Sequence, residues 1–212
     1  MCALKISTMA FERALEPHPT SAPLATRAPT ELHGDLAVWI IILAEMAVFG
    51  IFFWAFAGAR MAHVAAFHHD QATLDLRFGG INTALLISAS ACMVMAIDAA
   101  QKLQRRATLG WLLGCLAGGA GFVLIKLTEY SAKWAAGIDL SSSTFFMFYF
   151  LLTGFHFAHV LAGMVFVGWV GWLTARRPAA QAPLHALRSA GAFWHMVDLL
   201  WIVLFPLIYG LH

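Results

Sequence analysis

The sequence contains few charged residues and few cysteines. Asp, Glu, Lys and Arg make up only 11% of its 212 residues, whereas 61% are hydrophobic. Soluble domains are about half apolar and about a quarter charged, so this composition excludes an ordinary soluble domain and indicates a membrane protein. The formal net charge of +2 is too small to favour nucleic acid as a partner. Cys2, Cys92 and Cys115 have no CxxC or metal-ligand spacing, so we expect no disulfide framework and no cysteine-based metal site.

The first 34 residues lack a long apolar run. They contain four prolines and scattered charges, so residues 1–34 are expected to form a disordered tail on the cytoplasmic side. This segment shows no apolar stretch followed by a small-residue cleavage site, and we therefore expect no cleaved signal peptide. The remainder, residues 35–212, is predicted to be the membrane domain.

The remainder also lacks the alternation of apolar and polar residues that is typical of membrane β-barrels, so its spans are expected to be helices. Five apolar runs each approach the roughly 20 residues that cross a bilayer. The fourth is long enough to imply a tilt or an extension beyond the bilayer. The sequence therefore predicts an all-α bundle of five transmembrane helices. The expected spans are 36–59, 78–99, 109–130, 144–173 and 190–211.

Lys and Arg are distributed unequally among the segments that flank these spans. The tail and the loops at 100–108 and 175–189 would share one side of the membrane, and they carry nine of these residues against three on the other side. Because cytoplasmic segments are enriched in Lys and Arg, we predict the N-terminus inside and the C-terminus outside.

Three glycines follow one another at four-residue spacing in the third span, at Gly110, Gly114 and Gly118. This spacing places them on one face of a helix. Small residues on one face let neighbouring membrane helices approach closely, so these positions are predicted to form a helix contact.

Several ionisable residues lie inside the apolar runs, where they are costly and usually face other helices or a cavity. His156 and His159 are three residues apart in the fourth span, and His195 and Asp198 have the same spacing in the fifth. With the predicted orientation, Glu45 of the first span lies at a depth similar to theirs. We therefore expect these five residues to meet in one polar layer.

The sequence leaves the role of this layer open. Glu45 has no charged neighbour on its own helix, and it serves either in proton handling or lipid contact, or as a protonated carboxyl group bonded to a neighbouring helix. The histidines allow a metal or haem site, because imidazole binds iron, copper and zinc. His-x-x-His on one apolar helix is weak evidence for such a site, and a structural hydrogen-bond network needs the same residues.

Lys126 and Glu129 lie three residues apart near the outer end of the third predicted span. We expect an interfacial pair whose lysine side chain extends outward to the headgroups. Trp194, Trp201 and Tyr209 of the last span are expected to serve in packing and in interface anchoring.

Four segments resemble subunit III of the haem–copper cytochrome oxidases. They read LAEMAVFGIFFWAF, INTALLISAS, KLTEY with STFFMFYFLLTGFHFAHVLAG, and WHMVDLLWIVLFPLIY. The similarity spans residues 35–211, and the last two segments are the most specific. The residues at the family's motif positions are Glu45, Asn82, Thr83, Glu129, Tyr130, His156, His159, Gly163, Trp194, His195, Asp198 and Trp201.

The resemblance implies an accessory subunit of a respiratory oxidoreductase in the bacterial inner membrane, with no catalysis of its own. It implies that the chain holds phospholipid in a cleft, packs against subunit I, and supports proton uptake and stable turnover. It also implies no metal in this chain, the haem and copper or iron being held by the partner subunits. Glu45, Glu129, His156, His159, His195 and Asp198 are then residues related to lipid or protons.

Two alternatives remain. Seven helices are typical of subunit III, whereas five are predicted here. Five-helix forms include some bacterial oxidase subunits and NorE, an accessory protein of nitric oxide reductase, so a NorE-type role in denitrification is the nearer alternative. An independent transporter or haem-binding membrane protein is the more distant one.

Overall fold

The computed structural model describes residues 36–210. The predicted tail, residues 1–34, lies outside the described residues. Five helices are long and apolar enough to cross a membrane, which confirms the predicted all-α architecture with five spans. They are α2 (Leu36–Ala62), α4 (Leu76–Gln101), α5 (Arg105–Ala135), α6 (Thr144–Arg176) and α7 (Leu184–Phe205), the last continued by the π-helical turn η2 (Pro206–Gly210).

The helices extend beyond the apolar runs that predicted them. Helix α5 begins at Arg105 rather than at residue 109, and it ends at Ala135 rather than at residue 130. Helix α7 begins at Leu184 rather than at residue 190. The extra turns carry polar residues that can reach the headgroup region, so a helix in a membrane need not end where its apolar run ends.

A short helix that the sequence did not predict, α3 (Val64–Gln71), follows α2. It buries Phe67 and Gln71. The Phe67 ring lies 5.5 Å from that of Phe56 in α2 and 5.6 Å from that of Phe145 in α6. Helix α3 therefore packs its apolar side against the bundle instead of forming an extended loop.

Two helix starts are fixed by side-chain caps. The Asp75 carboxylate accepts a hydrogen bond from the Arg77 N–H at the start of α4, and the Ser143 hydroxyl accepts one from the Phe146 N–H at the start of α6. The Ser143 hydroxyl also donates to the Asp70 carboxylate over 2.6 Å. This bond ties α3 to the first turn of α6.

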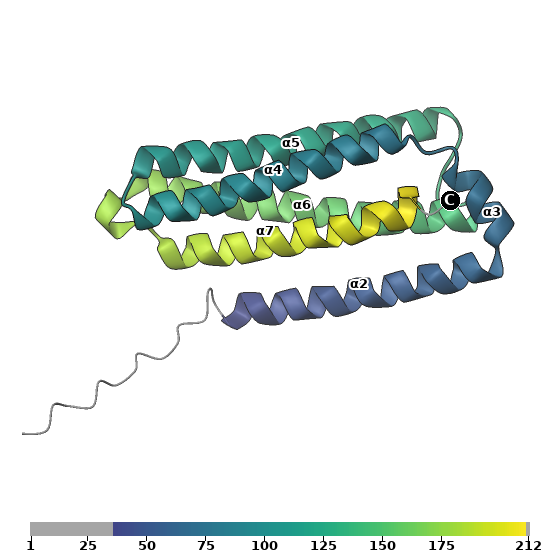
Figure 1. The fold of residues 1–212 in the computed structure, drawn as a ribbon, viewed down its shortest axis with the longest axis horizontal. Coiled ribbons are helices and arrows are strands. Elements are labelled where there is room, and N and C mark those ends of the chain that lie inside the picture. Colours follow the sequence, from purple (N-terminus) through teal and green to yellow (C-terminus); the bar gives the residue numbers. More distant parts are fainter. Residues whose placement is uncertain (1–35, 211–212) are drawn as a thin grey trace, which may run out of the picture. The chain divides into compact units, whose positions relative to one another are not determined.

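Helices α4 and α5 lie side by side over most of their length (Figure 1). A Cβ atom at Gly118 would lie 2.8 Å from the Ala89 Cβ and 3.0 Å from the Leu85 carbonyl oxygen, and one at Gly114 would lie 3.1 Å from Cys92 Sγ. At Gly110, a Cβ would meet no atom of the described residues within 4 Å. Two of the three aligned glycines thus lie against α4, and the third faces open space.

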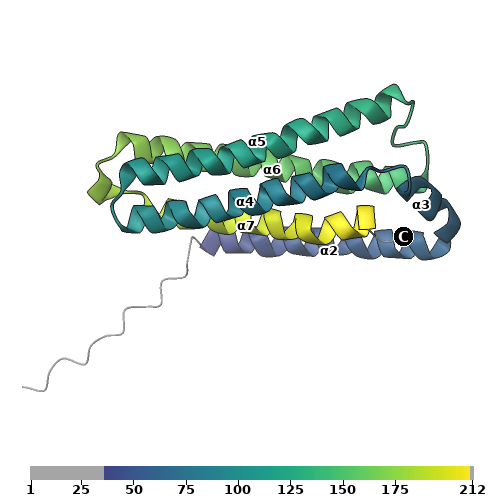
Figure 2. The ribbon, with the colours of Figure 1, turned by 45° about the horizontal axis from the view of Figure 1, so that its top comes forward.

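Helix α2 lies at the edge of the bundle, beside α7 and α6 (Figure 2). Its buried residues are Ile42, Phe49 and Phe56. They are seven residues apart, which is two helical turns, so they form one narrow stripe. The other faces of α2 are apolar and exposed, which suits contact with lipid or with another membrane helix.

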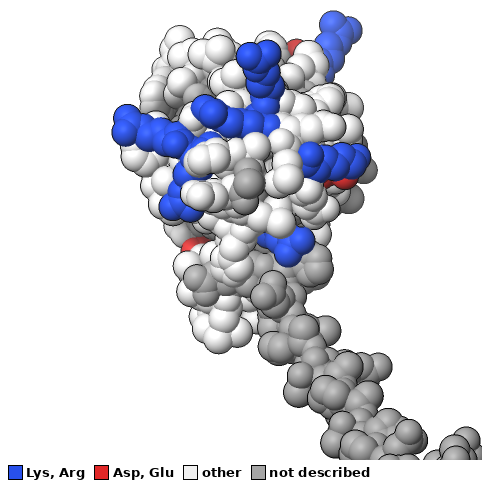
Figure 3. All heavy atoms as spheres, turned by 90° about the vertical axis from the view of Figure 1, so that its left-hand side faces the viewer, with Lys and Arg blue, Asp and Glu red and all other residues white. Residues whose placement is uncertain are grey.

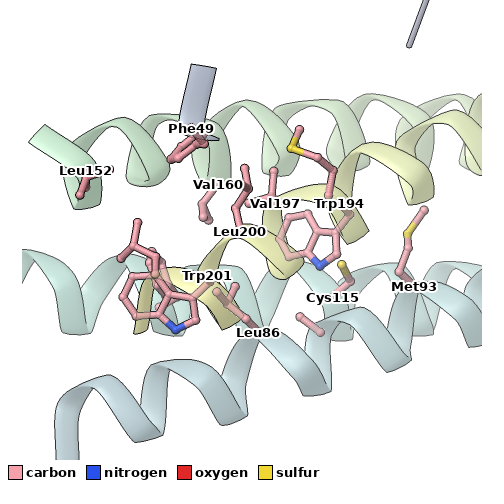
Figure 4. Close-up of a cluster of buried hydrophobic side chains, with 14 of the residues drawn as sticks. Phe49, Leu86, Met93, Cys115, Leu152, Val160, Trp194, Val197, Leu200 and Trp201 are labelled. Atoms are coloured by element: carbon pink, nitrogen blue, oxygen red, sulfur yellow. The ribbon is translucent and has the colours of Figure 1, made fainter. Parts of the chain in front are cut away.

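Helix α7 supplies the largest buried side chains of the core, Trp194 and Trp201, which are again seven residues apart (Figure 4). The Trp201 indole N–H donates to the Thr83 hydroxyl of α4 over 3.0 Å. Trp194 fills the space beside Gly119 of α5 and Gly163 of α6. The core is therefore built around α7.

Lys and Arg gather at the end of the bundle where α4 joins α5 and α6 joins α7 (Figure 3). We call this the basic end; its residues are Lys102, Arg105, Arg106, Arg176, Arg177 and Arg188. The opposite end, where α3 lies, carries Arg60, Arg77 and Lys133 in the described residues. This distribution agrees with the predicted orientation, which itself stays a prediction.

Candidate functional site

The most extensive group of buried polar side chains, which we call the Lys126 cluster, consists of Lys126, Glu129, Tyr149 and Tyr209. Lys126 Nζ lies 3.0 Å from Glu129 Oε2 and 2.7 Å from the Tyr209 hydroxyl. Glu129 Oε1 accepts hydrogen bonds from the hydroxyls of Tyr149 at 2.7 Å and Tyr209 at 2.5 Å. Each oxygen of the carboxylate therefore has a donor.

Three elements bring the Lys126 cluster together. Lys126 and Glu129 share one face of α5, Tyr149 comes from the second turn of α6, and Tyr209 comes from η2. The Gln71 side-chain amide donates to the Ile208 carbonyl oxygen over 2.8 Å. Helix α3 thereby holds the π-helical turn that positions Tyr209.

The prediction that Lys126 extends outward to the headgroups is wrong. Its side chain is 0% exposed. The lysine ammonium lies 4.9 to 5.5 Å from the ring centres of Tyr130, Tyr149, Trp201 and Tyr209. Around the Lys126 ammonium, water is replaced by ring faces, a carboxylate and hydroxyl groups. These groups stabilise the charge, so the Lys126 side chain can point into the bundle. Tyr209, Trp194 and Trp201 are likewise buried, so of the two roles expected for them the structure shows packing.

Polar contacts continue from this cluster along α6. The Tyr130 hydroxyl donates to the Thr153 hydroxyl over 2.8 Å, and Thr153 donates to the Tyr149 carbonyl oxygen over 2.6 Å. Tyr149, Thr153 and His156 follow one another at spacings of four and three residues, so they share a face of α6. This periodicity of polar residues was visible in the sequence, but only its histidine was singled out there.

His156 is fully buried between aromatic rings. Its ring centre lies 5.5 Å from that of Phe122 and 5.1 Å from that of Trp201. Neither of its ring nitrogens has a hydrogen-bond partner within residues 36–210. His156 thus faces α5 and α7, where it fills space in the core.

His159, in contrast, faces α2. Its Nε2 lies 3.1 Å from Glu45 Oε2, although the two groups are not aligned as a hydrogen bond. Its Nδ1 lies 2.8 Å from the Phe155 carbonyl oxygen. A carbonyl only accepts, so Nδ1 carries a proton, and Nε2 of a neutral ring is then an acceptor. The contact with Glu45 therefore needs a proton on one of the two partners.

Glu45 and His159 form a polar contact between α2 and α6. Their side chains are 26% and 13% exposed. The Phe49 ring, one turn further along α2, lies 5.6 Å from the His159 ring. The pair is therefore partly shielded by aromatic packing, and it lies at the edge of the bundle and not at its centre.

His195 and Asp198 lie on α7. His195 Nδ1 is 2.6 Å from the Ser90 hydroxyl of α4, whereas Asp198 Oδ1 is buried without a hydrogen-bond partner among the described residues. The structure thus pairs His195 with Ser90 and Glu45 with His159, and it surrounds His156 with rings. The sequence predicted one polar layer, but the structure has separate contacts. They are separate because α7 directs His195 toward α4, whereas α6 directs His159 toward α2 and His156 toward α5 and α7.

Within residues 36–210, no group of three or more His, Cys, Asp or Glu side chains is placed to hold a metal ion. Lys126, Glu129, His159 and His195 instead contact polar groups of the protein, and His156 is surrounded by aromatic rings. The arrangement supports hydrogen bonding between helices and holds charge inside the bundle.

A pocket of about 240 Å³ adjoins the Lys126 cluster. It is lined by Glu129 and Lys133 of α5, by Asp75 and Phe78 at the start of α4, and by three smaller residues. Glu129 is only 7% exposed, and it forms part of the wall of this pocket. Charges of both signs therefore line this pocket.

The chain is similar to several oxidase subunits. It is 28% identical over 180 residues to the heme-copper oxidase subunit I+III of Aeropyrum pernix, an alignment that covers 82% of this chain and 22% of that relative. It is 30% identical over 175 residues to cytochrome c oxidase subunit 3 of Thermostichus vulcanus, covering 82% and 85% of the two chains. It is 24% identical over 190 residues to quinol oxidase subunit 3 of Bacillus subtilis, covering 90% and 93%.

The chain thus spans about a fifth of the Aeropyrum relative and most of the other two. The family model for cytochrome c oxidase subunit III matches residues 31–211, which include all five spans. This chain therefore belongs to the cytochrome c oxidase subunit III family.

Proposed function

We propose that this chain is a non-redox accessory subunit of a respiratory haem–copper oxidase in the bacterial inner membrane. The observation that carries the proposal is the family match over residues 31–211. One relative is named as subunit I+III, a single chain that joins the two subunits, and this supports packing of the present chain against a separate subunit I. The haem and copper would then belong to the partner subunits.

The buried polar groups support a structural role for this chain. Lys126 and Glu129 bind each other and two tyrosines, and His195 binds Ser90. These contacts stabilise the bundle and leave little donor capacity for a substrate. The exposed apolar faces of α2 offer surface to lipids and to a partner helix.

We further propose that the chain holds phospholipid between its helices and supports proton uptake by the complex. The support for this part is the partly exposed Glu45–His159 pair, which needs a proton between the two side chains. The pair joins α2 to α6, so it supports proton uptake by keeping α2 in place beside a neighbouring subunit or lipid, and not by passing its proton on.

The test is purification of the full chain through an affinity tag from its own membranes, followed by identification of the copurified proteins and their haem and copper content. We expect subunit I of an oxidase in about equal amount. Copurification of nitric oxide reductase subunits instead would favour the NorE-type alternative. A Soret band in the chain purified alone, and lost in His159→Ala, would overturn the accessory role and favour a haem-binding protein.

A second measurement tests the supporting role. An oxidase purified without this chain should start turnover at a normal rate and lose activity sooner than the complete complex. Equal lifetimes of the two preparations would contradict the proposed support of proton uptake and stability.

A further inference from the structure

Two polar side chains in the described core leave all their hydrogen-bonding groups unpartnered. Asn82 of α4 and His156 of α6 are both 0% exposed. Neither the amide oxygen and nitrogen of Asn82 nor the two ring nitrogens of His156 bind any group of residues 36–210. A buried amide or imidazole without hydrogen bonds is costly, and a leucine or a phenylalanine would avoid this cost. The two residues therefore indicate a polar ligand inside the bundle.

Contacts with α7 and η2 fix the level of Asn82 in the bundle. The hydroxyl of the next residue, Thr83, accepts a hydrogen bond from the Trp201 indole N–H over 3.0 Å. Earlier on α4, a Cβ atom at Gly79 would lie 3.3 Å from the Tyr209 ring. Asn82 lies between these two contacts along α4, so its level is between those of Trp201 and Tyr209.

Lys126 and His156 lie at the same level, beside the Trp201 ring in the core (Figure 4). Lys126 Nζ lies 5.5 Å from the Trp201 ring centre and 2.7 Å from the Tyr209 hydroxyl. The His156 ring centre lies 5.1 Å from that of Trp201. Asn82, Lys126 and His156, which come from three different helices, therefore converge on one region of the core.

The Lys126 ammonium has donor capacity left for a ligand. It carries three N–H groups. Two of them have close acceptors, Glu129 Oε2 at 3.0 Å and the Tyr209 hydroxyl at 2.7 Å. The third contact, with the Tyr149 hydroxyl, is 3.4 Å long, beyond the usual range of about 2.7–3.2 Å. The third N–H group of Lys126 is therefore weakly bound and can take a closer acceptor.

Water is the ligand whose chemistry suits this region. A buried water molecule both donates and accepts, and it makes about two to four hydrogen bonds. It can accept from the Lys126 ammonium and donate to the Asn82 amide oxygen or to the unprotonated nitrogen of a neutral His156 ring. A cation is repelled by the Lys126 charge, and an anion without a proton offers no donor to the Asn82 oxygen.

We propose that Asn82, Lys126 and His156 hold buried water in the core of the bundle, and that this water completes the hydrogen bonding of the Lys126 ammonium. The site extends the Lys126 cluster along α6 toward the middle of that helix. It depends only on residues of this chain, so it goes beyond the accessory role and does not depend on which complex the chain joins.

The first test compares thermal midpoints of the full chain in detergent micelles. Asn82→Leu and His156→Phe remove the hydrogen-bonding groups and keep side chains of similar size. With water bound, each variant should lower the midpoint by about 2–4 °C, because the water loses a partner. In a dry core, removal of an unsatisfied amide or imidazole should raise the midpoint instead. A raised midpoint in either variant would overturn the proposal.

The double variant, Asn82→Leu with His156→Phe, separates shared water from local packing. If both residues bind the same water, the double variant should lose less than the sum of the two single shifts. The matched control combines Asn82→Leu with Thr174→Val, which removes a buried hydroxyl about 27 Å along α6 from His156, and its shifts should add. Additive shifts in the Asn82–His156 pair as well would contradict a shared site.

Nuclear magnetic resonance of the ¹⁵N-labelled chain in micelles detects the water itself. We expect transfer of magnetisation from water to the Asn82 side-chain amide and to the His156 ring N–H. The transfer to His156 should be lost in Asn82→Leu. The Gln71 side-chain amide is the matched control, because it is buried but donates to the Ile208 carbonyl oxygen, and it should receive no transfer. Absence of transfer to both Asn82 and His156 in the wild type would refute the water site and would assign any coupling between them to a direct contact.

Discussion

At the scale of single residues, the main finding is a lysine and a glutamate buried inside a membrane bundle. Such a pair is stable only while each charge keeps its partner and its hydrogen bonds. The Lys126 ammonium and the Glu129 carboxylate satisfy this condition through two tyrosine hydroxyls. The stability of the pair therefore depends on groups from α6 and η2 as much as on α5.

Lys126→Leu tests this dependence. The variant leaves the Glu129 carboxylate buried without its cation, so we expect the free energy of unfolding to fall by about 3–5 kcal/mol. Unfolding in mixed micelles, followed by circular dichroism, gives the value. Lys133→Leu is the control, since Lys133 binds Thr73 at the exposed end of α5 and should cost less than about 1 kcal/mol.

The double variant Lys126→Leu with Glu129→Leu sharpens the comparison. Removal of both charges leaves no unpaired ion, so most of the lost stability should return. A double variant that is as unstable as Lys126→Leu alone would show that packing, and not charge pairing, explains the loss.

Glu45 provides a second test at this scale. Glu45→Gln keeps the shape and a polar group next to His159, and it should leave assembly and turnover of the oxidase nearly unchanged. Glu45→Leu leaves His159 Nε2 without its polar neighbour, at a cost of about 1–3 kcal/mol, and should loosen α2. Turnover of the assembled complex over time is the measurement. Early loss of activity in both variants, with normal assembly, would instead indicate that Glu45 transfers protons.

The partners of these residues could not be read from the sequence. The spacing of Lys126 and Glu129 correctly suggested that they form a pair, but Tyr209 lies 83 residues after Lys126. No residue pattern within α5 indicates that η2, which follows α7, packs against α5. For the same reason, the sequence could place His156 and His159 on one helix but could not show that they face different neighbours.

At the scale of elements, the contact between α4 and α5 depends on small residues at some of the aligned positions. Gly118→Ala should destabilise the protein by about 1–3 kcal/mol, because its new methyl group meets the Leu85 carbonyl oxygen and the Ala89 side chain. Gly110→Ala is the matched control on the same helix. It meets no described atom and should be neutral or slightly stabilising, because alanine favours helix. Similar thermal shifts in the two variants would contradict the packing described for α5.

The loop between α5 and α6 should respond to pH. The Ser141 hydroxyl and N–H donate to Asp139 Oδ1 at 2.7 and 2.8 Å, with a further bond from Ser142, and these bonds lower the pKa of Asp139. Because the folded loop has the lower pKa, this stabilisation is complete above the usual pKa of an aspartate and is lost as the pH falls through the lowered value.

Hydrogen exchange of the loop amides, measured from neutral to acidic pH, checks this expectation. Protection of the amides next to Asp139 should decrease with acidification in the wild type. Asp139→Asn should already be less protected at neutral pH and should show little further change. Protection that is independent of pH in the wild type would refute the role of the carboxylate.

The elements themselves were predictable to different degrees. The five spans follow from long apolar runs, which need no tertiary information. Helix α3 was missed because it is only eight residues long and carries four polar residues, and its burial depends on rings from α2 and α6. The π-helical turn η2 was missed because the contact that holds it comes from Gln71, 137 residues earlier.

At the scale of the whole molecule, the unequal distribution of Lys and Arg predicts the orientation in the membrane. A reporter fused after the last residue should be active on the outer face, and one inserted between Arg176 and Arg188 should be active inside. Exchange of these two results would contradict the predicted orientation.

The position of Tyr209 also has a consequence for biosynthesis. The ribosome makes α5 before α6, and it makes η2 last among the described elements, so Lys126 and Glu129 exist for some time before either tyrosine is available. During that interval the two ionisable side chains enter the translocation machinery with only each other as partners. Their final environment is therefore reached only after α7 and η2 have been translated, so the closing of the Lys126 cluster is a late step in the insertion of these helices.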